Sequence, residues 1–196
     1  MLAAILLVIL TAIYRVATAV VVQHGGSAWL SNFAPMAAIA LCSAVYLPRK
    51  FKFSVPFAAL FLSDVILDAY YGASLFDPIV LSRYLAFGLV GLLGLAFTKR
   101  TTLRRLLPVS LLASLIFYIV TNAFSWLADP GYLKNFAGLI QALTVGLPAY
   151  GATPTWMFFR NSVLSDLLFT VLFVVCMNFS RRDTVLPARA PSPVSN

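Results

Sequence analysis

The chain has 196 residues, of which 61% are hydrophobic and 10% are charged, and its mean hydropathy is +0.93. A water-soluble domain is only about half apolar and is about a quarter charged, so the composition excludes a soluble globule and predicts an integral membrane protein. The formal charge of +8 arises from 14 Lys and Arg residues against 6 acidic residues, and these cations form no cluster on a soluble element. We therefore expect no binding of nucleic acid.

Six segments are predicted to form membrane-spanning helices, because a spanning helix needs about 20 mostly apolar residues, within a range of about 17–25. The segments are 2–23, 33–48, 53–71, 79–98, 106–127 and 161–179. Pro35, Pro56 and Pro108 lie near the starts of three of them, where proline costs no helical hydrogen bond. The fold class expected for residues 1–182 is an all-α, polytopic membrane bundle.

The first segment also has features of a cleaved signal peptide. Ala17, Thr18 and Ala19 resemble a small-residue cleavage site. However, no positive charge precedes the apolar run, and Arg15 interrupts it. We therefore predict a retained helix and keep cleavage as the alternative.

Basic residues predict how the helices cross the membrane, because Lys and Arg favour cytoplasmic loops. They gather in alternate connections between the predicted spans. These cations are Arg49, Lys50 and Lys52, then Lys99, Arg100, Arg104 and Arg105, and finally Arg181, Arg182 and Arg189. A topology of six spans with both termini in the cytoplasm places all three groups of cations on the cytoplasmic side.

Two stretches near the C-terminus are not predicted to cross the membrane. Residues 134–150 are interrupted by glycine and proline, which predicts a short helix at the outer surface or dipping into the membrane from it. A seventh span is the alternative, but it would place Arg181 and Arg182 outside, against the charge rule. Residues 183–196 are predicted to form a disordered cytoplasmic tail.

Charged residues inside the predicted spans are the main functional signal. They are Arg15, Asp64, Asp68, Arg83 and Asp166. The orientation of each helix places all of them in the outer half of the membrane. A charge at the centre of a spanning helix costs about 2.5–3.5 kcal/mol on insertion scales, so we expect these groups to meet one another or water.

Helical spacing places other polar residues on the same faces as these charges. The four stripes are Thr11, Arg15 and Thr18; Asp64, Asp68 and Tyr71; Tyr118, Asn122 and Ser125; and Ser162, Asp166 and Thr170. We expect the stripes to face a common interior and to form a polar pocket open to the outside. The alternative is a dry salt-bridge network that fixes helix packing. A through-channel is not expected, because the inner half lacks a polar lining.

No catalytic or metal-binding constellation is evident. His24 is a lone histidine in an outer loop, and Cys42 and Cys176 lie in apolar runs. Ser63 stands beside Asp64 without a neighbouring base, and no phosphate loop is present. We therefore expect no enzyme activity, no cofactor and no bound metal.

Small residues mark places where helices can approach closely. Gly88, Gly91 and Gly94 recur within one predicted span, and Ala40 and Ala44 recur within another. Such spacing is typical of helix–helix contacts in membranes. We expect these residues to serve packing.

Several stretches resemble a known group of proteins. They are NFAPMAAIAL (32–41), LSD (62–64), TNAFSWL (121–127), GL (138–139), LP (147–148) and DLLFT (166–170). Together they resemble a bacterial membrane family of unknown function. Its members are described as similar to the substrate-binding S components of energy-coupling factor (ECF) transporters.

The resemblance implies six helices, cytoplasmic termini, and an outward-facing pocket for a vitamin, a related small molecule or a metal ion. In such transporters, a transmembrane subunit and two ATPases form an energising module. The Ala-x-x-x-Ala surface that many S components carry on helix one is absent here, since Ala12 is followed by Val16 and Ala17 by Val21. Ala40 and Ala44 carry this spacing on the second predicted helix instead. A cobalamin-binding S component is a relative, but its cobalt-ligating Cys is not reproduced.

The sequence therefore predicts a solute-binding subunit of the bacterial inner membrane that takes up a vitamin or a similar small molecule, including a cobalamin-like compound. The expected substrate-binding residues are Asn32, Asp64, Asp68, Tyr71, Asn122, Ser125, Trp126 and Asp166, with Arg15 and Arg83 as counter-charges or anion contacts. Asp64→Asn is then expected to weaken binding without unfolding the protein. The alternative function is a structural or assembly protein of the membrane that has an internal salt-bridge network and no small ligand.

Overall fold

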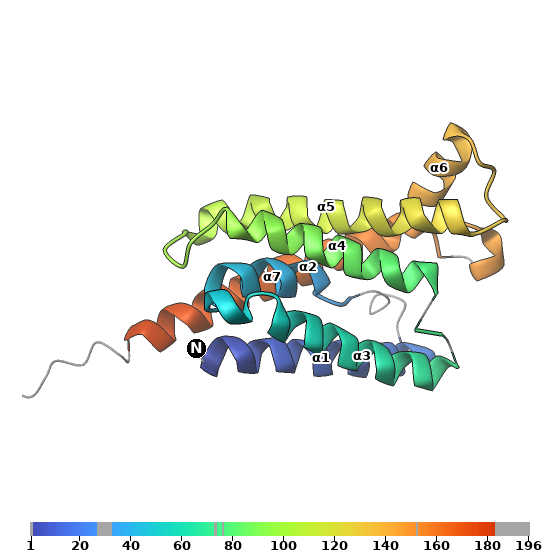
Figure 1. Ribbon diagram of the computed structural model, residues 1–196. Helices are drawn as coiled ribbons and strands as arrows, with labels where there is room; N and C mark the ends of the chain where they lie inside the picture. Colours follow the sequence, from blue (N-terminus) through green and yellow to red (C-terminus); the bar gives the residue numbers. More distant parts are fainter. Residues whose placement is uncertain (1, 27–32, 73, 76, 152, 183–196) are drawn as a thin grey trace, which may run out of the picture.

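The structure is a computed structural model that describes residues 2–26, 33–72, 74–75, 77–151 and 153–182 (Figure 1). Within these ranges all regular secondary structure is helical, which confirms the all-α class. The α-helices are α1 (Leu2–Gln23), α2 (Met36–Tyr46), α3 (Ser54–Tyr71), α4 (Pro78–Leu95), α5 (Leu103–Ala128), α6 (Phe136–Leu143) and α7 (Thr155–Arg182). Two 3-10 turns, Arg49–Phe51 and Pro148–Tyr150, precede α3 and α7. The predicted binding residue Asn32 and the predicted tail, 183–196, lie outside the described residues.

In the described part of the chain, 5 helical segments are long and apolar enough to cross a membrane. They are Leu2–Gln23, Arg49–Tyr71, Pro78–Leu95, Leu103–Ala128 and Thr155–Ser180. Their outward-facing leucines, isoleucines and phenylalanines are exposed, as a lipid-facing surface requires. These features are compatible with a multi-pass membrane protein.

The second predicted span, 33–48, is corrected by the structure. Its helix, α2, has 11 residues, and at about 1.5 Å per residue these extend over about 16 Å, roughly half of a 30 Å hydrocarbon core. Pro35 precedes the helix, and the backbone becomes extended at Leu47 and Pro48. Proline therefore limits the helix at both ends, because it cannot continue a helical hydrogen-bond ladder.

The long helices form a bundle in which both ends of the described chain lie together (Figure 1). The start of α1 and the end of α7 lie at one end of the bundle, with the α2–α3 and α4–α5 connections. These two connections carry Arg49, Lys50 and Lys52, and Lys99 and Arg100, respectively. The helix α6 lies at the opposite end. Apart from Lys134, in the loop between α5 and α6, the cations of the described loops therefore lie at one end of the molecule.

The short helix α2 forms the centre of the core. Every residue from Met36 to Tyr46 is buried, and α2 packs against α1, α3, α4, α5 and α7. Such a helix is shielded from water and from lipid along its whole length. Its terminal N–H and C=O groups therefore need partners from within the protein.

Charged side chains meet the two ends of α2. Its N-cap residue, Pro35, makes no side-chain cap, and the carboxylate of Asp166 on α7 instead accepts the Ala38 N–H at 2.8 Å. Near the other end, the ammonium group of Lys52 donates to the carbonyl oxygen of Ala44. An anion at the N-terminus and a cation at the C-terminus both complement the helix dipole.

The segment 134–150 forms a short helix, as predicted. The helix α6 has 8 residues, and Asn135 caps it by accepting the Gly138 N–H at 2.9 Å. A 3-10 turn follows over Pro148–Tyr150. Since α6 is far too short to cross a membrane, the alternative of a seventh span in this segment is wrong.

The small residues of α2 and α4 make a close helix contact. A Cβ atom added to Gly94 would lie 2.7 Å from the Ala44 Cβ and 2.8 Å from the Leu41 carbonyl oxygen. Backbone atoms of a buried helix cannot move aside easily. At Gly88, by contrast, an added Cβ would meet only Phe57, at 3.7 Å.

We expect Gly94→Ala to lower the free energy of unfolding by about 1–3 kcal/mol, because it overpacks the α2–α4 contact. Gly88→Ala is the matched control and should cost nothing, because its methyl group has room. Thermal melts of the two variants in the same detergent test this. Equal melting temperatures would contradict the close contact.

We also expect Asp166→Ala to destabilise the protein, because it leaves the buried Ala38 N–H without an acceptor, at a cost of about 1–3 kcal/mol. Asp166→Asn keeps a carbonyl oxygen for that N–H and should cost less. The melting temperatures of both variants give the comparison. An Asp166→Ala protein as stable as the wild type would show that α2 does not need this cap.

Candidate functional site

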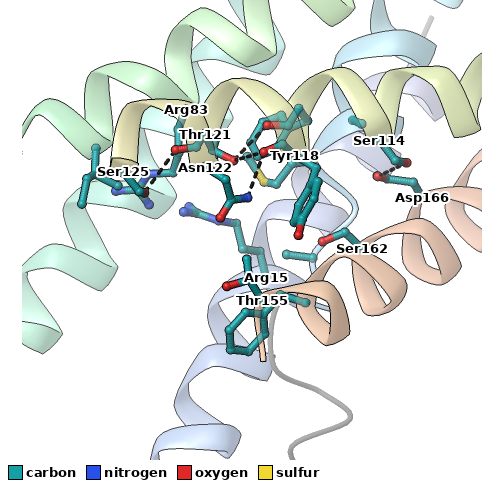
Figure 2. A pocket seen from close by; sticks show the side chains of 16 residues that line it. Arg15, Arg83, Ser114, Tyr118, Thr121, Asn122, Ser125, Thr155, Ser162 and Asp166 are labelled. Atoms are coloured by element: carbon teal, nitrogen blue, oxygen red, sulfur yellow. Dashed lines mark hydrogen bonds between the residues drawn. The ribbon is translucent and has the colours of Figure 1, made fainter. Parts of the chain in front are cut away.

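A cavity of about 270 Å³ lies beside the N-terminal end of α2. Ten of its lining residues are polar (Figure 2): Arg15, Arg83, Ser114, Tyr118, Thr121, Asn122, Ser125, Thr155, Ser162 and Asp166. The remaining lining residues are Ala34, Met36, Ala37, Ile79, Phe117 and Phe158. The cavity therefore combines a polar face with an aromatic and aliphatic one, as small-molecule sites commonly do.

The shortness of α2 explains where the cavity lies. Because α2 begins only at Met36, none of the described helices occupies the centre of the bundle beyond its N-terminus. The flanking helices α1, α4, α5 and α7 continue past this point and supply the polar walls. Arg83 is placed in the second turn of α4, whose start is fixed by Pro78 and by the Asp77 carboxylate, which accepts the Ile79 N–H at 2.7 Å.

A buried ion cluster supports one side of the cavity. Asp64 on α3 is fully buried, and its Oδ1 atom accepts from the guanidinium groups of Arg15, at 2.6 Å, and Arg83, at 3.1 Å. Arg15 also donates to the Ser63 hydroxyl. Asp68 lies one turn further along α3, at 3.9 Å from Arg83. Two cations and two anions thus compensate one another across α1, α3 and α4.

Asp166 supports another part of the cavity wall. Its Oδ1 atom accepts the Ala38 N–H, and its Oδ2 atom accepts the Ser114 hydroxyl at 2.7 Å. One turn further along α7, Thr170 bonds the Ser110 hydroxyl of α5 at 2.9 Å. Figure 2 shows the Ser114–Asp166 pair apart from Arg15 and Arg83. Within the cavity wall, the carboxylate and the guanidinium groups are therefore separate.

The described structure assembles only part of the predicted set of binding residues. Arg15, Arg83, Asn122, Ser125 and Asp166 line the cavity. The carboxylates of Asp64 and Asp68 do not line it, because they lie behind the two arginines. The sequence placed both carboxylates at the pocket surface, since helical spacing identifies a shared face but not which side chain covers which.

Two further predicted residues lie away from the cavity wall. Tyr71 is 45% exposed and its hydroxyl donates to the Ala19 carbonyl oxygen at 3.3 Å. Trp126 donates its Nε1–H to the Leu133 carbonyl oxygen at 2.8 Å, which ties the end of α5 to the loop before α6. Both residues therefore hold local structure rather than forming the lining.

Other lining residues were not predicted. Ser114 and Thr121 lie on the same face of α5 as Tyr118, Asn122 and Ser125, so extending that stripe by one turn would have found Ser114. Thr155 and Phe158 come from the first turn of α7. They were missed because the predicted span began only at residue 161, whereas the helix begins at Thr155.

The cavity has the chemistry of a binding site for a small polar molecule. It offers guanidinium, hydroxyl and amide groups together with two phenylalanine side chains. Among the described residues, no three His, Cys, Asp or Glu side chains come together as a metal site. The arrangement can bind and orient a solute through hydrogen bonds and apolar contacts.

The burial of Asp64 changes the result expected for its substitution. Asp64→Asn removes the negative charge between Arg15 and Arg83, and breaking a buried ion pair in this way costs about 3–5 kcal/mol. We therefore expect a large fall in melting temperature instead of the fold-neutral loss of binding predicted from the sequence. Asp68→Asn is the matched control and should cost less than Asp64→Asn, because its one contact with Arg83 is long, at 3.9 Å. Similar melting temperatures for the two variants would contradict the conclusion that Asp64 is the main stabilising partner of Arg15 and Arg83.

Comparisons with known proteins give one family. A search of curated proteins and a search of solved structures each gave no match. Residues 1–189 match a family described as a family of unknown function, DUF6580. Because the match covers nearly the whole sequence, the chain belongs to the DUF6580 family.

Proposed function

We propose that this protein is a membrane solute-binding subunit that takes up a small molecule, such as a vitamin, through an outward-facing pocket. The observation that carries the proposal is the cavity of about 270 Å³, with its polar and aromatic lining. Ligand pockets commonly measure about 300–1,000 Å³, so a compact solute fits this space best.

The distribution of charge supports the proposed direction of binding. The cationic connections lie at one end of the bundle, and cations favour the cytoplasmic side. Arg83, in the second turn of α4, and Ser125, in the last turn of α5, lie toward the other end. In the proposed orientation both termini are cytoplasmic, the membrane is the bacterial inner membrane, and the cavity opens outward.

The similarity to S components of ECF transporters is supported by the sequence resemblance alone. An energising module is the partner that this resemblance implies. The Ala40 and Ala44 pair cannot serve as its docking surface, because both residues are buried inside the bundle, at 2% and 0% exposure. A partner of this kind would have to use another, lipid-facing surface.

A structural role is the second candidate, and the buried ion cluster favours it. Arg15, Asp64, Arg83 and Asp68 join three helices, as a network that fixes helix packing would. In that case the cavity would hold only water. The two candidates differ in whether a small molecule stabilises the protein.

A thermal-shift screen of the detergent-purified protein tests the proposed function. The panel contains water-soluble vitamins, cobalamin precursors, nucleobases and divalent metal ions. A compound at 100 times its dissociation constant should add about 2.7 kcal/mol of stability. We expect at least one clear shift, which Asn122→Leu abolishes by removing an amide from the cavity wall.

Leu112→Ala is the control, because Leu112 lies on the outer face of the same helix and is 46% exposed. It should retain the ligand-induced shift. A flat panel would favour the structural role. A shift that survives Asn122→Leu would place the bound compound outside this cavity.

A further inference from the structure

The charged groups of the cavity wall are unequally accessible. Asp166 is 2% exposed and has hydrogen-bond donors on both oxygens. The side chain of Arg15 is 8% exposed and is bonded to Asp64 and Ser63. The side chain of Arg83 is 24% exposed, the most accessible of the three. A solute entering the cavity therefore meets a positive charge more readily than a negative one.

Arg83 also has unused capacity to donate hydrogen bonds. Its Nη1 atom donates to Asp64, and its Nη2 atom lies 3.9 Å from Asp68, beyond hydrogen-bond distance. Its Nε–H is buried and has no acceptor among the described residues. Because Nη2 has no acceptor within hydrogen-bond distance in the described part of the chain, an acceptor on the solute would bond it favourably. The buried Nε–H is not accessible to a solute without a shift of the Arg83 side chain.

Arg83 is the accessible charged donor of the wall, although Asp64 and Asp68 balance the charges of Arg15 and Arg83 from behind. The lining contains two guanidinium groups and one carboxylate, and the Asp166 carboxylate is already bonded at the N-terminus of α2. The fork of an arginine matches a carboxylate in two parallel hydrogen bonds. Away from Arg83, the wall offers the rings of Phe117 and Phe158 for an apolar part.

We infer that the solute is a small organic carboxylate, with its carboxylate on Arg83 and its apolar part against Phe117 and Phe158. This inference rests on the proposed solute-binding function. Arg15 and Asp64 act as positioning residues, because Asp64 holds both guanidinium groups at the wall.

Matched acid and amide pairs test the inference on the full chain in detergent. The pairs are nicotinate with nicotinamide, pantothenate with pantothenamide, and biotin with biotinamide. Dissociation constants are measured by titration calorimetry at fixed salt. We expect at least one acid to bind at least tenfold more tightly than its neutral partner.

Variants at Arg83 test whether this residue causes the preference for the acid over its amide. Arg83→Gln should reduce the acid-to-amide ratio of affinities to about one while leaving the affinity for the neutral partner unchanged. Arg105→Gln is the control, because Arg105 is exposed near the start of α5, away from the cavity, and it should keep the wild-type ratio. If Arg83→Gln does not fold, Arg83→Lys keeps the charge but loses the fork, and it should lower the ratio.

The possible results separate this inference from the proposed function. If neutral or cationic compounds bind as tightly as the acids, the inference fails and the solute-binding function stands. A preference for acids that survives both Arg83 variants also overturns it. If none of the acids, amides or screened compounds binds, both proposals fail.

Discussion

The arrangement of this protein depends on a central helix that is too short to cross a membrane. The 11 residues of α2 are all buried, so the N–H and C=O groups at its ends need partners from within the protein. Asp166 and Lys52 meet these ends with charges of the sign that the helix dipole favours. The same shortness leaves space beyond the N-terminus of α2, and the longer flanking helices line that space with polar groups. The core and the cavity are therefore two consequences of one helix length.

The ion cluster connects stability with the candidate site. Arg15 and Arg83 belong to both, because each lines the cavity and each bonds Asp64. A charged group inside a membrane bundle is costly unless it is paired, and here the pairing also orients two cations toward a hollow space. A packing network and a binding site are thus compatible in one cluster. Substitution of Asp64 is therefore expected to change the stability of the protein. Substitution of a lining residue such as Asn122 is expected to change the binding of the solute.

Much of the architecture could be predicted from residue patterns. The long apolar runs gave five of the six expected spans, because span length follows directly from the thickness of the hydrocarbon core. The stripes on α1, α5 and α7 correctly indicated polar faces that meet inside the bundle, since helical spacing fixes which residues share a face. The early start of α7 and the true length of α2 were not predicted, because flanking prolines and packing, not hydropathy alone, set these boundaries.

The sequence by itself determined the helical class, the approximate spans, the gathering of cations in alternate loops and the confinement of buried charge to one part of the bundle. These features follow from composition, segment length and helical period, which are local properties. Only the tertiary structure decided that Asp64 lies behind the arginines while Arg83 faces the cavity. It also decided that Asp166 caps α2. These assignments depend on contacts between helices distant in sequence, because a side chain's role in a buried cluster is set by which neighbours cover it.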